Sequence, residues 1–327
     1  MTVLEITCDE SGYEGEKLIG TTTTVFAHAS VHLSVDAAGI AMRELRRRIQ
    51  SPATQYKAIH LLRERHRPVL AWVLGPTGPL LGNAHVFLLD KAFHLVGKVL
   101  DLLVGDGIAN AGTLYRDGRR AFGPERWEEF LVAANDLMRV KDRLDTRTSV
   151  DAFFDVIGGL RLGGAPARLD ELLELLGRAR PRAEAFRARL LDEPGMISTL
   201  DPLIPAIVRA VAHWGAGGDP VAIAHDRQRT LSPERIAQLK QLVGTPNPGP
   251  LGHAAGTRLA SLSLVAAESD LRVQLADIVA GTVRKIASDE LAGHGDPELI
   301  TLLRPYVDAH SVWGDDRSWS LLAPAPR

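Results

Sequence analysis

Apolar and polar positions along the chain divide it into two kinds of region. Short runs of apolar and β-branched residues, typical of strands, lie at 3–8, 85–91, 220–225 and 262–266. Alternation at 21–33 predicts one long strand or a hairpin. Between 105 and 218 the spacing of apolar residues is helical instead, over 125–144, 169–176, 182–191 and 203–213. The pattern therefore predicts an α/β protein with a helical insertion.

The strand-like runs alternate with predicted helices. These cover 36–49, 63–74, 92–104, a segment opening at Ser232-Pro233-Glu234, and a helix near 297–308, whereas 315–327 looks irregular. The run at 85–91 is almost continuously apolar, which predicts a parallel strand covered on both faces. The run at 262–266 is interpreted as a buried strand.

The last long helix begins at Ser269 or Asp270, either of which supplies an N-cap. Its apolar face comprises Leu271, Leu275, Ile278, Val279, Thr282, Val283 and Ile286. Gln274, Asp277 and Gly281 follow a neighbouring stripe. Glycine inside a helix costs about 1 kcal/mol relative to alanine, so Gly281 predicts the close approach of another backbone or of a ligand.

These patterns give three parts. Residues 1–104 and 219–290 are predicted to form the α/β core, 105–218 an inserted helical subdomain, and 291–327 a C-terminal helix and tail. The chain length of 327 residues suffices for such a core.

Composition narrows the function. With 45% hydrophobic residues, 24% charged residues and a formal net charge of −2, the chain has no bulk positive charge for binding nucleic acid. Arginine-rich islands at 43–48, 63–67 and 178–189 are interpreted as solvated helix faces, with a local phosphate track as the alternative.

The single cysteine, Cys8, excludes an internal disulfide and fits a reducing compartment. There is no signal-like N-terminus and no apolar run of membrane-spanning length. The sequence therefore predicts a cytoplasmic protein without membrane association.

Acidic residues follow the predicted strands, and this is the main chemical signal. They stand where ligands collect in open α/β sheets, with one more acid on the last helix: Asp9, Glu10, Asp90, Asp226 and Asp277. Mg²⁺ and similar hard cations prefer carboxylate oxygens from separate elements, and two such ions clamp an in-line phosphoryl displacement. An N-cap or turn role for single members, such as Asp9, is the alternative.

Other chemistries lack their patterns. There is no CxxC or HExxH for zinc and no GxxxxGK[ST] or GxGxxG after a strand for a nucleotide. No GxSxG elbow is present, and Ser11 has no evident His and Asp partners.

Two motifs resemble those of the bacterial domain of unknown function family 3800: Asp9-Glu10-Ser11-Gly12 after the first strand, and Gln274-Leu275-Ala276-Asp277 in the last helix. Leu89-Asp90-Lys91 and His225-Asp226-Arg227-Gln228 match it as well. The resemblance covers roughly the first and last hundred residues. Where that family often has an acid two residues before a lysine, this chain has Gln55 before Lys57.

The resemblance implies a ribonuclease H-like mixed sheet with flanking helices and a metal-dependent, nuclease-like site. Asp9, Asp90 and Asp277 would bind Mg²⁺ or Mn²⁺, with two ions expected, while Glu10 or Asp226 completes the ligand set or orients water. Lys57 and Lys91 would neutralise phosphate charge, and Ser11 and Gln274 would contact the substrate.

The expected function is therefore a metal-dependent phosphodiester hydrolase acting on RNA or DNA, in bacterial defence or nucleic-acid processing. One alternative is a hydrolase of a small phosphate ester or nucleotide, with the helical insertion closing over the pocket. Another is a non-catalytic interaction module that binds a protein partner through the insertion. The sequence leaves the oligomeric state open.

Overall fold

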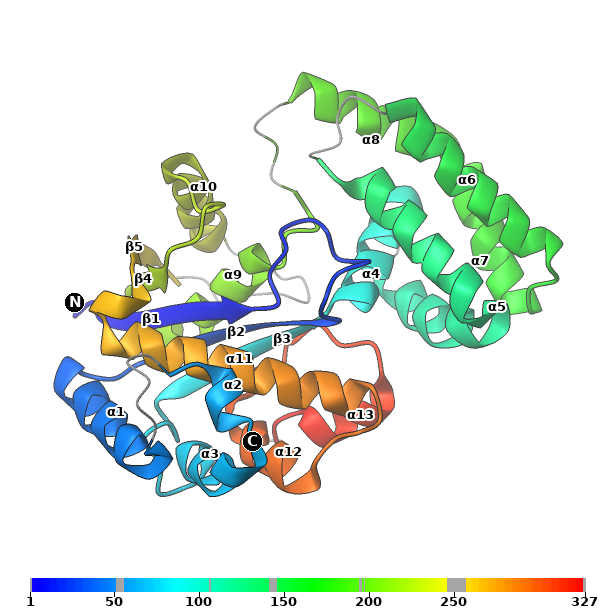
Figure 1. Ribbon diagram of the computed structural model, residues 1–327. Coiled ribbons are helices and arrows are strands. Elements are labelled where there is room, and N and C mark those ends of the chain that lie inside the picture. Colours follow the sequence, from blue (N-terminus) through cyan, green and yellow to red (C-terminus); the bar gives the residue numbers. More distant parts are fainter. Residues whose placement is uncertain are drawn as a thin grey trace.

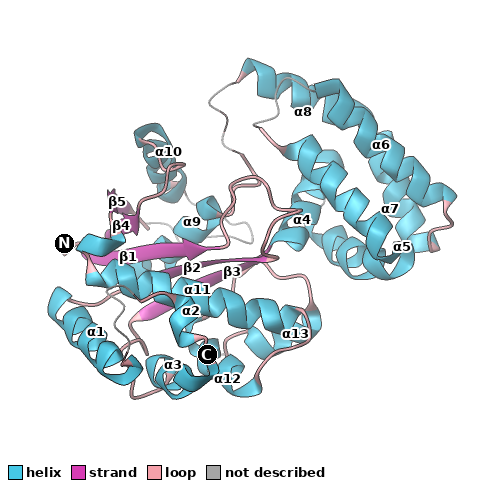
Figure 2. Cartoon of the chain, viewed as in Figure 1, coloured by secondary structure: helices cyan, strands magenta, loops and turns pink. Residues whose placement is uncertain are grey.

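The computed structural model describes residues 2–50, 56–105, 107–140, 146–193, 196, 198–245 and 257–325. Gln55 and the end of the helix predicted at 125–144 lie outside these residues. The described chain is an α/β protein in which helices flank a five-stranded mixed sheet, and a helical region extends to one side (Figures 1 and 2). The predicted α/β class is confirmed.

The sheet has the order β3-β2-β1-β4-β5. β1, β4 and β5 run parallel, and β2 pairs antiparallel with both β1 and β3. The strands are β1 (Leu4–Ser11), β2 (Val25–Val31), β3 (Ala84–Asp90), β4 (Val221–Asp226) and β5 (Leu259–Val265). The carboxyl ends of β1, β3, β4 and β5 therefore share one edge of the sheet.

Two strand predictions need correction. β3 does not pair with a parallel neighbour strand, because its partner β2 is antiparallel. All seven of its residues are nevertheless buried, because Val86 and Leu88 join the core on one face and Phe87 and Leu89 the core on the other. Val307 and Val312 form isolated parallel bridges with its outer edge. β5 is an edge strand and not a buried one, and its side chains are exposed except at Leu259, Leu262 and partly Val265. Apolarity alone did not distinguish a central strand from a protected edge.

One face of the sheet is covered by the N-terminal and C-terminal helices. α11 crosses β1 and β2, and α1 and α3 pack beside it. The helices of this layer are α1 (Val35–Ile49), α2 (Ala58–Leu61), α3 (Arg67–Leu74), α11 (Leu271–Leu291), α12 (Pro297–Leu303) and α13 (Asp316–Leu322), with short 3₁₀ turns at Glu64–His66 and Arg304–Tyr306.

α11 begins and packs as its sequence predicts. The Asp270 side chain caps the helix by accepting from the backbone N–H of Arg272 at 2.9 Å. A Cβ placed on Gly281 would lie only 2.6 Å from the Cβ of Ala58 in α2. The predicted close approach at Gly281 is therefore confirmed, and it sets α2 directly against the long helix.

The other face is covered by α9 (Leu203–Trp214) and α10 (Pro233–Gly244). α9 lies within the range predicted for the insertion, 105–218, yet its apolar residues join the core formed by Ile6, Phe26 and Phe87 of the sheet. α10 begins as predicted, with the Ser232 hydroxyl accepting from Arg235 N–H and Pro233 in the first turn.

The helical region has its own apolar core. It comprises α4 (Lys91–Leu103), α5 (Gly107–Met138), α6 (Thr146–Leu162), α7 (Ala167–Arg178) and α8 (Arg180–Asp192). α5 bends at Gly123, whose φ of 79° is not helical, immediately before Pro124. α6 is absent from the predicted helices because Gly158 and Gly159 interrupt its pattern. Both glycines are exposed, so they lower the helix propensity locally without disturbing the packed face of α6.

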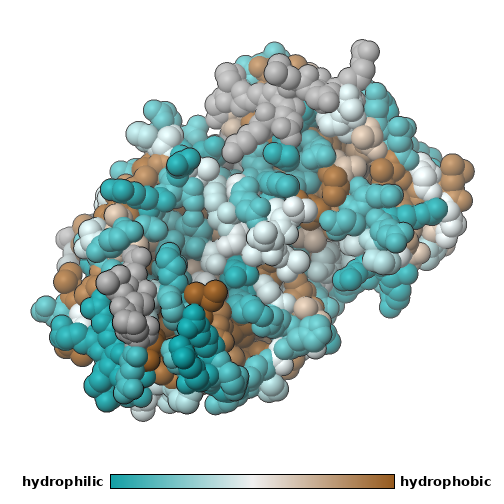
Figure 3. All heavy atoms as spheres, in the orientation of Figure 1, coloured by the Kyte–Doolittle hydropathy of each residue, from teal (hydrophilic) through white to brown (hydrophobic). Residues whose placement is uncertain are grey.

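The tail also folds. The end predicted to be irregular contains α13, capped by the Asp315 carboxylate accepting from Ser318 N–H, and Leu322 joins the core below α11. Hydrophilic side chains cover much of the face seen in Figure 3, with apolar residues interspersed. No helix in the described ranges is long and apolar enough to cross a membrane.

Candidate active site

Three carboxylates from separate elements gather at the carboxyl edge of the central strands. Cys8 of β1 pairs with His225 of β4, so the next residues, Asp9 and Asp226, stand at the same level of adjacent parallel strands. Asp277 joins them from α11, which packs across β1. Burial, together with the charges of Glu10, Asp277 and Asp226, raises the pKa of Asp9 to about 9, against one backbone hydrogen bond that lowers it. The two ends of the chain therefore meet at one acidic site.

Each of these carboxylates has one oxygen engaged in the described structure. Asp9 Oδ1 accepts from Glu10 N–H at 2.7 Å, and Asp226 Oδ1 accepts from Ala267 N–H at 3.0 Å. Asp277 Oδ2 lies 3.4 Å from Lys57 Nζ. Burial raises the pKa of Asp277, Lys57 lowers it, and Asp226 raises it. Among the described residues, no hydrogen bond or ion pair is found for the second oxygen of each carboxylate.

Two cations border the acids. Lys57 precedes α2 and is 60% exposed, so its ammonium group can move to another partner at little cost. Arg284 follows Asp277 by two turns of α11 and donates from Nε to the Ser11 hydroxyl at 2.9 Å. Burial lowers the pKa of Arg284. Sequence reasoning missed Arg284; its spacing of seven residues from Asp277 was the available signal.

The backbone at position 12 explains why the first motif ends in glycine. Its φ is +81°, which favours glycine, and an added Cβ would lie 2.5 Å from the Val25 carbonyl oxygen and 2.8 Å from Arg284 Cδ. The turn after β1 can therefore close against β2 and α11 only without a side chain at this position.

Glu10 lies on the opposite face of the sheet from Asp9, because successive strand residues alternate. Its carboxylate accepts from the Gln228 side-chain amide and lies 3.5 Å from His225 Nε2. His225 is fully buried, and its ring lies 5.4 Å from that of buried His28. Burial and the neighbouring His225 lower the pKa of His28 well below its usual range. Glu10 therefore influences Asp9 by charge, while its side chain faces this histidine pair.

Asp90 does not join the acids, contrary to the ligand set that the resemblance implies. Through the ladder, Asp9 lies opposite Ala29 and Ala29 opposite Val86, which is four residues before Asp90. Asp90 is thus about 13 Å further along the sheet and about 10 Å to the side. Its Oδ1 instead accepts from the N–H groups of Ala92 and Phe93, and so caps α4.

Lys91 and Gln274 are also placed away from the acidic oxygens. Lys91 is 1% exposed and donates to Thr21 Oγ1 at 3.2 Å and Thr23 Oγ1 at 2.8 Å. Gln274 is buried beside the helix N-terminus, where its amide donates to the Ala267 carbonyl at 2.9 Å. Gln274 therefore holds the turn after β5 against α11, and its substrate role is not supported by this position.

The side chains do not enclose an ion in this arrangement. Among the described residues, no three His, Cys, Asp or Glu side chains are grouped closely enough to hold a metal. The donor set itself, three carboxylates, is of the type that Mg²⁺ and Mn²⁺ prefer.

Comparisons with known proteins supply no further assignment. No protein-family model, no curated protein and no solved structure matches this chain.

Proposed function

We propose that this protein is a metal-dependent phosphodiester hydrolase that acts on RNA or DNA. The observation that carries the proposal is the convergence of Asp9, Asp226 and Asp277, three partly or fully buried acids with one exposed lysine beside them. Buried like charges raise one another's pKa values and are stabilised by a bound cation. The ligand set is thus Asp9, Asp226 and Asp277, with Asp226 in the place that the resemblance gives to Asp90.

The fold is consistent with the proposal. We assign the mixed sheet to the ribonuclease H-like type, since only β2 runs against the other strands and the acids follow the central parallel pair. This assignment rests on an analogy of fold, and the chemistry rests on the site residues.

Each residue of the site has a distinct role in the proposed reaction. One or two bound Mg²⁺ or Mn²⁺ ions would supply Lewis-acid activation of the phosphoryl group and of the attacking water. Asp9, Asp226 and Asp277 present the oxygens for this cation. Lys57 releases Asp277 and turns to a non-bridging phosphate oxygen, and Arg284 offers a second cation from the other side of Ser11.

The decisive experiment combines metal binding with cleavage. Isothermal titration of Mn²⁺ should show binding to the intact chain, and a labelled single-stranded RNA or DNA should be cut only when the metal is present. Asp226→Asn should abolish both signals, whereas Asp90→Asn should retain both. Equal loss in the two variants, or cleavage that survives Asp226→Asn, would contradict the assigned ligand set.

A further inference from the structure

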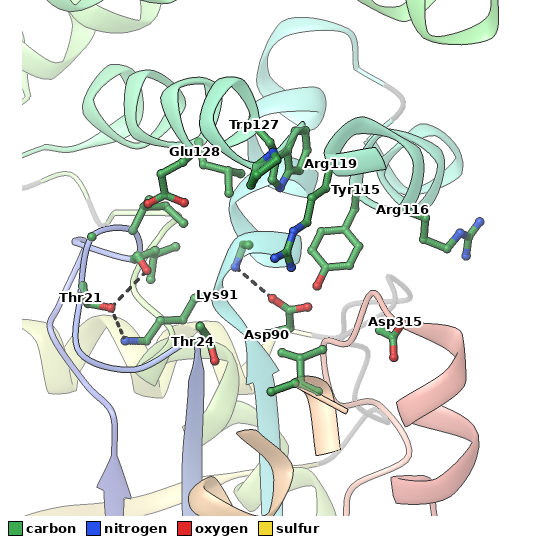
Figure 4. Close-up of a pocket in the computed structure, with 18 of the residues that line it drawn as sticks. Thr21, Thr24, Asp90, Lys91, Tyr115, Arg116, Arg119, Trp127, Glu128 and Asp315 are labelled. Carbon is green, nitrogen blue, oxygen red and sulfur yellow. Dashed lines mark hydrogen bonds between the residues drawn. The ribbon is translucent and has the colours of Figure 1, made fainter. Parts of the chain in front are cut away.

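A cavity of about 850 Å³ lies between the α/β core and helix α5 (Figure 4). Its walls come from the connection between β1 and β2, the junction of β3 and α4, the middle of α5, the end of α11, and Asp315 just before α13. Its size is in the range of cavities that hold whole small ligands, and exceeds what one phosphate ion requires. None of the three clustered acids lines it.

Lys91 is the most unusual residue of this cavity. It is 1% exposed, and its ammonium group donates only to two neutral threonine hydroxyls, with the nearest carboxylate, Glu14, 3.9 Å away. Burial lowers the pKa of Lys91 to about 8; the charge of Glu14 opposes this shift, and the charge of Arg284 adds a smaller lowering. A buried ammonium whose ion-pair partner lies at 3.9 Å, beyond hydrogen-bond distance, is only partly compensated, so it marks a place where an anion would be stabilised.

Arg119 supplies a second positive charge. Its side chain is exposed, and its guanidinium group points toward the space above Asp90 and Tyr115 in Figure 4. The other arginines of the wall are engaged: Arg116 bonds Asp316 at 2.6 Å and points away, and Arg120 bonds Asp117. Lys91 and Arg119 are therefore the two cations that face the cavity without a carboxylate partner in hydrogen-bond contact.

Helix α11 runs from the acidic site to the cavity wall, with Arg284 between them. Asp277, Arg284 and Leu291 follow one another at intervals of seven residues, and Leu291 lines the cavity. Seven residues of helix span about 10.5 Å, so the cavity lies roughly 20 Å from Asp277, with Arg284 between them. Thr23, which accepts from Lys91, also borders Gly12. A chain of phosphates leaving the acids would pass Arg284 and reach Lys91.

We propose that this cavity is a nucleotide subsite, in which Lys91 and Arg119 bind a phosphate group of the substrate away from the acids that carry out the chemistry. The inference rests on the proposed function for the direction of the strand, but the binding itself requires no metal. The phosphate belongs either to a nucleotide unit of the strand or to a free nucleotide.

Binding is measured on the Asp277→Asn background in EDTA, with a fluorescently labelled single-stranded oligonucleotide and anisotropy detection. Lys91→Gln and Arg119→Gln should each weaken binding about tenfold and reduce the dependence of log K on log salt by about 0.7. Lys98→Gln, on the same helix as Lys91, and Arg126→Gln, on the same helix as Arg119, both lie outside the cavity wall and are the matched controls. Equal effects in tests and controls would overturn the subsite.

Competition identifies the source of the phosphate. A nucleoside monophosphate that displaces the probe from the parent chain but poorly from Lys91→Gln indicates a free-nucleotide site, and displacement by oligonucleotides alone indicates a unit of the strand. Both results support a nucleotide subsite. Inorganic phosphate competing as well as either would overturn the nucleotide class.

Two further measurements distinguish loss of binding from loss of the fold, and failure of the subsite from failure of the proposed hydrolase function. Lys91→Met should unfold at the same temperature as the parent chain or higher, because a buried charge is removed, so loss of binding in this variant is not loss of fold. Oligonucleotide binding that depends on Lys91 without any metal-dependent cleavage would refute the hydrolase and keep the subsite. Metal-dependent cleavage with unaltered oligonucleotide binding in both cavity variants would refute the subsite and keep the hydrolase.

Discussion

Asp9 and Asp90 occupy equivalent places in the sequence and different places in the molecule. Each directly follows an apolar run of a strand, and each is almost completely buried. Asp9 lies near Asp226 and Asp277, whose charges raise its pKa. Asp90 Oδ1 instead accepts hydrogen bonds from the first backbone amides of α4. The comparison teaches that an acid after a strand is a ligand candidate only when a second strand end and a helix bring further acids to its level.

The difference follows from the sheet. β1 and β4 are parallel neighbours in register, so their terminal acids are adjacent. β3 is separated from β1 by the antiparallel β2, and it continues four residues past the level of Asp9. Neither separation is visible in the local sequence of Leu89-Asp90-Lys91.

The largest expected effect is a loss of cleavage when an acid of the cluster is replaced. Asp9→Asn and Asp277→Asn should each reduce metal-dependent cleavage at least about 10³-fold, because each removes a charged oxygen ligand from the proposed centre. Single-turnover cleavage assays in Mn²⁺ measure it. Asp289→Asn, on the same helix and paired with Lys285, is the control that should remain active.

The next effect concerns the contact that positions Lys57. Gly281→Ala should destabilise the protein by about 1–3 kcal/mol, since the new methyl group would meet Ala58 at 2.6 Å and displace α2. Denaturant unfolding measures the loss. Gly158→Ala in α6, where a Cβ meets nothing within 4 Å, should instead be neutral or stabilising. A stable, fully active Gly281→Ala variant would show that this packing is not needed.

A smaller effect is expected at the other acid of the comparison. Asp90→Ala should lower stability by about 1 kcal/mol through loss of the α4 cap, with cleavage within about twofold of the parent chain. Asp90→Ser restores a capping oxygen and should recover most of the loss. Thermal unfolding and cleavage are measured in parallel. A thousandfold loss of cleavage in Asp90→Ser would show that Asp90 acts as a metal ligand.

The smallest expected effect is a change in how stability depends on pH. In metal-free protein the pKa of Asp9 is raised to about 9, well above the unfolded value near 4, so between these values the folded state binds more protons than the unfolded state. The contribution of Asp9 to stability therefore falls as pH rises through this window. Melting temperatures of the parent chain and Asp9→Asn, measured from pH 5 to 9 in EDTA, should diverge, with the variant less sensitive. Parallel curves would mean that Asp9 is not protonated.

The sequence alone determined the α/β class and most element boundaries, and it named all three clustered acids as candidates. Period-two and period-3.6 patterns are local, and so are the N-caps Ser232 and Asp270 and the close approach that Gly281 requires. Asp9, Asp226 and Asp277 were candidates because strand ends and helix faces can be recognised from neighbouring residues.

Only the tertiary structure decided which candidates meet. Strand order and register separated Asp90 from Asp9, alternation along β1 turned Glu10 to the histidine face, and packing of α11 brought Arg284 to Ser11. These outcomes depend on pairings between residues far apart in the chain. Such pairings are selected by the burial of whole faces, and no short segment carries that information.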